Sequence, residues 1–164
     1  MAMELWVLSD RQLNSIAEWQ SAINGDGFPL RLSNVTSLKD LRGFLPAQLG
    51  EKPTGFECSH WPAHEFLREM RTMTDADLSH DWKYVLAFRW RGDFNELRAA
   101  WIAGAAYAHA TEGVVFDDQE GKLRNAHEAR EVARREFEAP DLDVKSAVDT
   151  VLRDLKLGPY RKDD

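Results

Sequence analysis

The stretch at residues 84–121, YVLAFRWRGDFNELRAAWIAGAAYAHATEGVVFDDQEG, decides the fold that we expect for this chain. Residues 84–90 are mostly apolar, which is typical of a buried strand. Asp93 can cap a helix over residues 94–111, and a second apolar segment follows at residues 114–116. The order strand, helix, strand predicts a βαβ unit at the centre of the protein.

The helix expected at residues 94–111 is almost free of bulky side chains. Small residues allow a helix axis to lie close to a sheet. We therefore expect this helix to be the most buried one in the protein. Its small residues are Ala99, Ala100, Ala103, Gly104, Ala105, Ala106, Ala108 and Ala110.

The remainder of the chain alternates short apolar segments with helical patterns. Further strands are expected at residues 4–8, 28–32 and 55–60, and the strands at 4–8 and 84–90 should form the central pair. The pattern predicts an α/β (or α+β) fold, with a sheet of about five strands flanked by helices and with two C-terminal helices. Whether the strands run parallel stays open. Apart from residues 94–111, helices are expected at residues 10–24 after a capping box at Ser9 and Gln12, at 37–48, at 62–70, at 125–138 and at 144–155.

Length and composition fit one soluble globular domain over residues 1–164, with a frayed tail at residues 160–164. The chain is 43% hydrophobic and 30% charged, which excludes disordered and fibrous classes. Its net charge of −7 argues against nonspecific binding to nucleic acid or to anionic membranes, which reward clusters of Lys and Arg. A basic partner would be attracted instead.

A cytoplasmic location is expected from three features. The only cysteine, Cys58, cannot form an internal disulfide, which favours a reducing compartment. No apolar run approaches the ~20 residues that span a bilayer. The first four residues also lack the basic and apolar regions of a signal peptide.

The segment around Cys58 offers two chemical hypotheses. His60 and His64 lie near Cys58 and Glu65, and zinc sites use such residues at short spacings. However, the segment crosses from a strand end to a helix start, and no second pair elsewhere completes a tetrahedral set, so we expect no metal site and no cofactor. Cys58 and His60 point to the same side of a strand and could form a nucleophile and its base. The alternative is that Cys58 is a small buried hydrophobic residue.

The acidic loop at residues 117–121 directly follows the strand at 114–116, where open α/β sheets usually carry their sites. Asp117, Asp118 and Glu120 supply only part of the six or more oxygens that a hard cation needs. Three interpretations stay open: a solvated turn, a docking patch for a basic protein, and an ion or acid–base site.

Two of the six tryptophans, Trp61 and Trp82, lie beside polar loop residues and are candidates for partial exposure. An exposed aromatic side chain among carboxylates is typical of a protein-binding hot spot. The alternative is that each of them covers an edge of the core. The chain has no Gly-rich phosphate loop, dinucleotide fingerprint, nucleophile elbow or His-Glu-x-x-His motif.

Four short runs together resemble a pattern that recurs in small bacterial α/β proteins: Phe88-Arg-Trp90, Asp93-Phe-Asn-Glu-Leu97, Ala99-Ala-Trp101 and Gly113-Val-Val-Phe-Asp-Asp-Gln-Glu-Gly121. Such proteins are commonly cognate immunity proteins of secreted polymorphic toxins, including type VI effectors. The resemblance covers about a third of the chain. Related sequences often carry paired glycines where this chain has Glu112-Gly113.

The resemblance implies a bacterial immunity protein (an antitoxin) that acts by protein–protein interaction through an acidic surface and has no catalytic residues of its own. Its partner would be a basic toxin domain whose active site it occludes, with no nucleic acid or membrane bound; a homodimer stays open. Two alternatives remain: a small hydrolase or transferase that uses Cys58, His60 and His64, and an adaptor subunit that docks through the last helix. The expected partner-binding residues are Asp75, Asp77, Asp81, Asp117, Asp118 and Glu120, with Trp61 or Trp82 as the apolar anchor.

Overall fold

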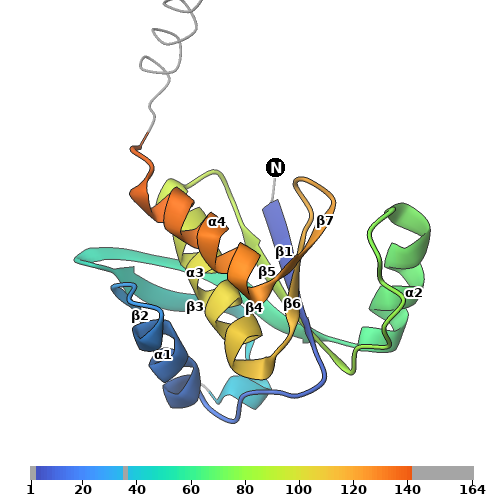
Figure 1. Ribbon diagram of the computed structural model, residues 1–164. Coiled ribbons are helices and arrows are strands. Elements are labelled where there is room, and N and C mark those ends of the chain that lie inside the picture. The colour runs from blue at the N-terminus through green and yellow to red at the C-terminus, as the bar shows by residue number, and fades with distance from the viewer. Residues whose placement is uncertain (1–2, 35–36, 142–164) are drawn as a thin grey trace, which may run out of the picture.

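A seven-stranded sheet in the order β2-β3-β4-β5-β1-β6-β7 organises the described part of the chain, and each strand is antiparallel to its neighbours. The computed structural model describes residues 3–34 and 37–141 (Figure 1). The fold is α+β, and the sheet has more strands than the five expected. The strands are β1 (Met3–Ser9), β2 (Leu30–Leu32), β3 (Arg42–Leu49), β4 (Lys52–Trp61), β5 (Tyr84–Trp90), β6 (Val114–Asp117) and β7 (Lys122–Asn125); the helices are α1 (Ile16–Gly25), α2 (Ala63–Met73), α3 (Phe94–Thr111) and α4 (Ala126–Glu138), with a 3₁₀ turn at Leu38–Asp40.

The expected βαβ unit is present as β5, α3 and β6, with β1 inserted between the two strands. Both β5 and β6 pair antiparallel with β1, so they run parallel to each other. The expected central pair is confirmed, because β1 and β5 pair along their whole length, from Met3 opposite Trp90 to Ser9 opposite Tyr84.

The expectation that the acidic loop ends a strand of an open α/β sheet is wrong. The chain leaves β6 through a tight turn and returns at once as β7, which pairs with β6 from Asp117 opposite Lys122 to Val114 opposite Asn125. The loop is therefore the tip of a β-hairpin, and the rule that locates sites at the ends of parallel strands does not apply to it. The sequence pattern did not predict β7, which is short and mostly polar.

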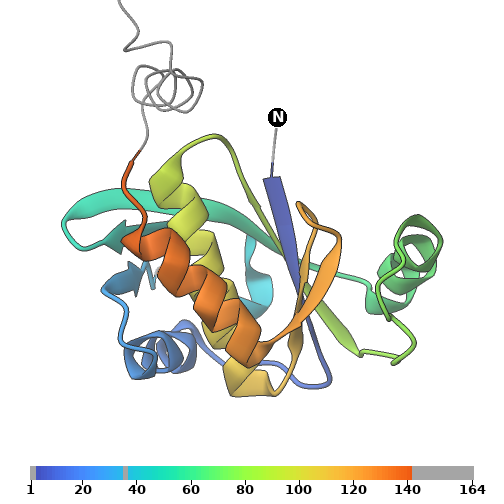
Figure 2. The ribbon, with the colours of Figure 1, turned by 45° about the horizontal axis from the view of Figure 1, so that its top comes forward.

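Helix α3 lies against the middle of one face of the sheet, between α1 and α4 (Figures 1 and 2). It is the most buried helix of the described residues, as its small side chains predicted. A Cβ atom at Gly104 would lie 2.9 Å from Leu5 Cδ1, which shows how closely the helix approaches β1. The expected cap is also present, since the Asp93 carboxylate accepts from the amides of Asn95 and Glu96 at 2.8 and 3.0 Å.

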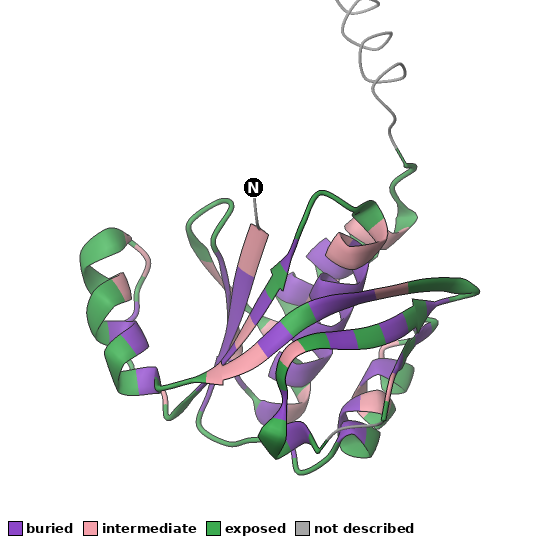
Figure 3. Cartoon of the chain, turned by 180° about the vertical axis from the view of Figure 1, so that it is seen from behind, coloured by how far each residue is buried: buried purple, intermediate pink, exposed green. Residues whose placement is uncertain are grey.

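The described residues cover the opposite, outer face of the sheet only in part. Phe66 and Leu67 of α2 and Leu78 of the following loop pack with Trp6, Leu8, Val85 and Phe116 in a small second core. The rings of Trp6 and Phe66 lie 5.1 Å apart. Figure 3 shows from behind that no described helix crosses β3 and β4 on this face, where buried and exposed residues alternate along the strands.

The first helix begins later than expected, at Ile16 instead of residue 10. Ser15 is its N-cap, and the Ser15 hydroxyl accepts from the Glu18 amide at 3.1 Å. Ser9 is buried at the end of β1 and donates to the Arg11 carbonyl. The capping box at Ser9 and Gln12 was therefore wrong, because a second capping pattern six residues later starts the helix instead.

The helix expected at residues 37–48 is also wrong, since this segment is a 3₁₀ turn followed by β3. The leucine spacing fitted a helix, but Leu45, Ala47 and Leu49 alternate with exposed residues and face the core. Pro46 lies opposite Gly55, and its carbonyl accepts from Ser33, one residue beyond β2. The missing N–H of Pro46 thus falls where the ladder to β2 ends.

The last described helix agrees with its prediction. Asn125 and Glu128 form the expected capping box at the start of α4, with N–H···O distances of 2.8 and 3.1 Å. The helix ends at Glu138. The expected helix at residues 144–155 and the tail at 160–164 lie outside the described residues. None of the described helices is both long and apolar enough to cross a membrane.

Candidate functional site

Cys58 lies in the core of the sheet between β3 and β5 and is only 1% exposed. Burial raises the pKa of the Cys58 thiol well above its ordinary value. The ring of His60 is committed elsewhere, since its Nε2 atom lies 3.0 Å from the Leu38 carbonyl oxygen. An activated thiolate needs a lowered pKa and access, so this environment disfavours a nucleophile. Across residues 3–34 and 37–141, no three His, Cys, Asp or Glu side chains are placed to hold a metal ion.

Asp117, at the hairpin tip, is 4% exposed and is bonded within its own loop. One carboxylate oxygen accepts from the amides of Gln119 and Glu120, and the other lies 3.2 Å from Nε and Nη2 of Arg124. Asp117 therefore fixes the shape of the hairpin and is not exposed for contact. The Nη2 atom of Arg124 also lies 3.0 Å from Oε2 of Glu120.

Asp118 has the opposite environment to Asp117, because it is exposed and forms no ion pair among the described residues. Its pKa is raised, first by partial burial and then by the nearby charges of Glu4 and Asp117. The charge of Asp118 is thus uncompensated and lies beside β1.

The acidic residues after α2 belong to a loop that is held by local bonds. Asp81 pairs with Arg71 at 2.9 Å, and Ser79 donates to Asp77, which lowers the pKa of Asp77. Asp75 is exposed. Trp82 is partly buried, and its ring lies 4.3 Å from that of His80.

The structure does not gather all of these residues in one patch. His80 binds Asp10 at 2.7 Å, just beyond the C-terminal end of β1. Asp118 instead lies near Glu4, at the N-terminal end of the same strand. Six residues of extended chain separate the two positions by roughly 20 Å.

A row of charged residues crosses the outer face of the sheet. Phe44 of β3 pairs in register with Glu57 of β4, Glu57 pairs with Arg89 of β5, and Arg89 pairs with Glu4 of β1. Arg89 binds Glu4 through Nη2 at 2.6 Å and Nε at 2.9 Å, and this hydrogen bond raises the pKa of Arg89. Asp118 extends the row beyond Glu4, so carboxylates outnumber cations along it.

Between this row and α2 lies a groove of about 350 Å³, which we call the outer-face groove. It is the strongest candidate for a functional site because it combines apolar walls, carboxylates and an exposed tryptophan on a rigid sheet. Trp61 is 57% exposed at its edge, and Phe44, which begins the row on β3 and does not line the groove, is equally exposed. The groove is lined by Glu4, Trp6, Glu57, Cys58, Ser59, Trp61, Phe66, Glu69, Met70, Ala87, Phe88 and Arg89.

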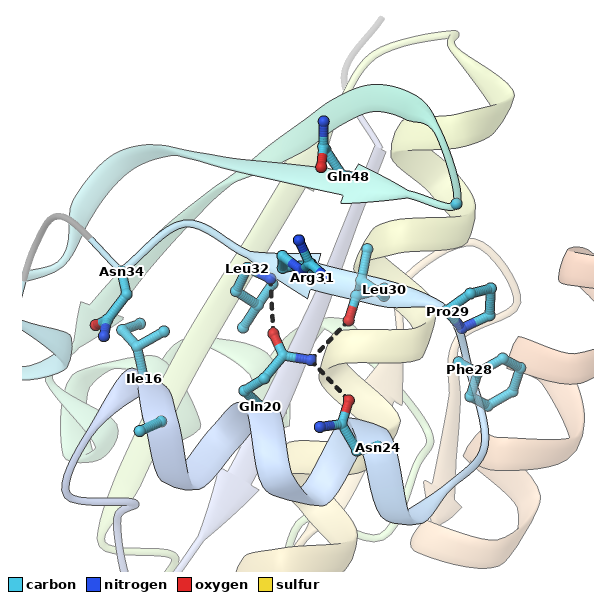
Figure 4. Close-up of a pocket in the computed structure, with 12 residues that line it drawn as sticks. Ile16, Gln20, Asn24, Phe28, Pro29, Leu30, Arg31, Leu32, Asn34 and Gln48 are labelled. Atoms are coloured by element: carbon cyan, nitrogen blue, oxygen red, sulfur yellow. Dashed lines mark hydrogen bonds between the residues drawn. The ribbon is translucent and has the colours of Figure 1, made fainter.

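A larger cavity of about 580 Å³ lies between α1 and β2, which is an edge strand (Figure 4). Its central feature is the Gln20 side chain, which donates to the Leu30 carbonyl at 2.7 Å and accepts from the Leu32 amide at 2.8 Å. These two backbone groups point away from β3, so Gln20 occupies hydrogen-bonding positions that an added strand would use. We interpret this cavity as part of a protected sheet edge.

Sequence reasoning located part of the outer-face groove and missed the rest. The alternation in β4 predicted that Glu57 and Ser59 face away from Cys58, and the structure confirms it. Trp61, which the sequence offers as a candidate anchor, lines the groove. The sequence places Phe44 in a helix, whereas it lies on β3. The alignment of Arg89 with Glu57 and Glu4 depends on the pairing register of β4, β5 and β1, which a single sequence does not provide.

Comparison of the chain with protein-family models, with curated proteins and with solved structures gives no match.

Proposed function

We propose that this protein is a non-catalytic immunity protein that binds one secreted bacterial toxin domain and occludes its active site. The observation that carries the proposal is the outer face around the outer-face groove, where exposed aromatic side chains lie beside carboxylates that form no ion pair with a described residue, and where α2 covers the sheet only in part. The resemblance of residues 88–121 to immunity proteins and the net charge of −7 support the same function.

The interface proposed from the geometry differs in detail from the one expected from sequence. Trp61 and Phe44 are the apolar anchors, since each leaves more than half of its surface to solvent. Glu57 and Asp118 supply charge at the two sides of the Arg89–Glu4 pair. Asp117 acts indirectly, by holding the hairpin that carries Asp118.

A rigid acidic face suits the capture of a basic toxin. Uncompensated carboxylates attract a basic cleft over several ångströms and speed association, while the buried aromatic contacts slow dissociation. The strands fix the backbone from which these side chains extend, so little backbone conformational entropy is lost when the partner binds. Carboxylates on this face would take the place of the anionic substrate of the toxin.

The test uses the toxin domain encoded by the neighbouring gene, if that gene encodes a secreted protein. We expect a stable complex that abolishes toxin activity, with association rates that fall as salt rises. Glu57→Lys with Asp118→Lys should slow association roughly tenfold and flatten its salt dependence. The matched control is Glu131→Lys on α4, which lies on the other face and should leave the rate unchanged. Full toxin activity in the presence of the wild-type protein would contradict the proposal.

A further inference from the structure

The outer-face groove brings together two carboxylates from different elements. Glu57 extends from β4 and Glu69 from α2, and both line the same groove. Ser59 and Ala87, which pair with each other across β4 and β5, also line it, and their small side chains leave the groove open. A side chain of another molecule that enters the groove would therefore lie between two negative charges.

Of the described residues, Arg89 is the only cation that lines the groove, and it is already neutralised. Arg89 is bound to Glu4 through two nitrogens, as described above. Neither Glu57 nor Glu69 forms an ion pair with any described residue. Arg42 lies opposite Ser59 in the sheet but does not line the groove. The groove thus keeps a net negative charge that its own residues do not compensate.

The walls add an aromatic surface to this charge. Trp61 is 57% exposed at the groove, and Trp6 and Phe66 line it farther in. A flat guanidinium group can stack on an indole face and still donate hydrogen bonds to carboxylates in its plane. A lysine ammonium is a compact, strongly hydrated point charge and uses such a surface less well.

We infer that the outer-face groove receives an arginine side chain of a partner protein, with its guanidinium held between Glu57 and Glu69 and stacked on Trp61. The inference rests on the proposed function in one respect, because it names the chemical group by which a toxin domain would be recognised. The volume of the outer-face groove, about 350 Å³, is at the lower end for small-ligand sites and suits one long side chain.

The experiment needs no toxin. The uniformly ¹⁵N-labelled full chain is titrated with N-acetyl-arginine-methylamide, and the backbone amide shifts are followed by NMR. We expect saturable shifts at Ser59 and Ala87, with millimolar affinity. The citrulline analogue has the same shape without the charge and should bind at least fivefold more weakly. The lysine analogue should bind more weakly than arginine because it lacks the planar group.

Variants separate this site from general attraction to an acidic protein. Glu57→Gln and Glu69→Gln should each weaken arginine binding about threefold, the effect of losing one exposed ion pair. Glu131→Gln on α4 should not change it, and well-dispersed spectra show that each variant is folded. Absence of saturable shifts, equal binding of citrulline, or equal weakening by Glu131→Gln would overturn the inference.

The outcome is independent of the toxin experiment. Arginine binding without toxin neutralisation would leave the groove as a guanidinium site and remove the immunity function. Neutralisation without arginine binding would keep the function and move its interface away from the groove.

Discussion

Two adjacent aspartates at the hairpin between β6 and β7 show how position decides the role of identical residues. Asp117 is buried and its oxygens accept four N–H groups, two from the backbone of its own turn and two from Arg124. Asp118 points to solvent, and its pKa is raised because Glu4 and Asp117 add to partial burial. The first carboxylate stabilises the hairpin, and the second contributes charge to the surface.

The two aspartates should therefore differ in their effect on stability. Asp117→Ala removes the acceptor of two backbone amides and the more buried of the two carboxylates that hold the Arg124 guanidinium, and we expect a loss of about 3 kcal/mol in the free energy of unfolding. Asp118→Ala should leave stability unchanged or slightly higher at neutral pH. The reason is that a raised pKa in the folded state means that charging Asp118 opposes folding above its unfolded pKa. Urea denaturation of both variants measures the difference, and equal losses would contradict this assignment.

A helix or strand was predictable from sequence where its segment fitted only one local pattern. Capping residues mark the starts of the helices at residues 94–111 and 125–138, residues 84–90 form one mostly apolar segment, and the two helices and the strand lie where they were expected. The segment at 42–49 was misassigned because its apolar residues satisfy both helical and strand spacing, and only pairing with β4 decides between them. The four residues of β7 carry no apolar alternation and depend on the hairpin for their structure.

The candidate site was harder to predict than the elements, because it depends on how distant segments of the chain pair. Its residues come from β1, β4, β5 and α2, so the site exists only once the strand order is known. Glu4 and Arg89 are 85 residues apart in sequence, yet their side chains form an ion pair. The alternation within β4 indicated which side Glu57 faces, but it could not indicate which residues lie beside it.

Strand β2 is a short edge strand whose outward backbone groups are occupied by Gln20 of α1 (Figure 4). Gln20→Ala should remove the bonds to Leu30 and Leu32 and lower the free energy of unfolding by about 1–2 kcal/mol. It should also expose the edge to pairing with a second molecule. Sedimentation over a range of protein concentrations tests this, with Gln12→Ala, an exposed loop position, as the control. A variant that stays as monomeric and as stable as the control would show that Gln20 does not protect the edge.

At the scale of the whole molecule, the two faces of the sheet differ in burial and in charge. The face that carries α1, α3 and α4 holds the main core, including Cys58 and the closely packed rings of Trp19, Phe56 and Phe88. Among residues 3–34 and 37–141, the outer face carries one helix and leaves charged and aromatic side chains exposed. Burial on one side supplies the stability of the fold, while the other side keeps charge that the described residues do not compensate.

This division predicts the reactivity of the single thiol. Cys58 belongs to the core side of the sheet, is 1% exposed and has a raised pKa, so a thiol reagent should reach it only when the sheet opens. We expect its modification by an aromatic disulfide reagent to be at least about a thousandfold slower than that of a cysteine introduced at exposed Ser21, measured in a Cys58→Ser background. Urea below the unfolding transition should accelerate the reaction of Cys58 and leave that of the surface cysteine unchanged. Rapid modification of Cys58 in the folded protein would instead reveal an accessible thiol beside His60 and favour a hydrolase or transferase over a binding protein.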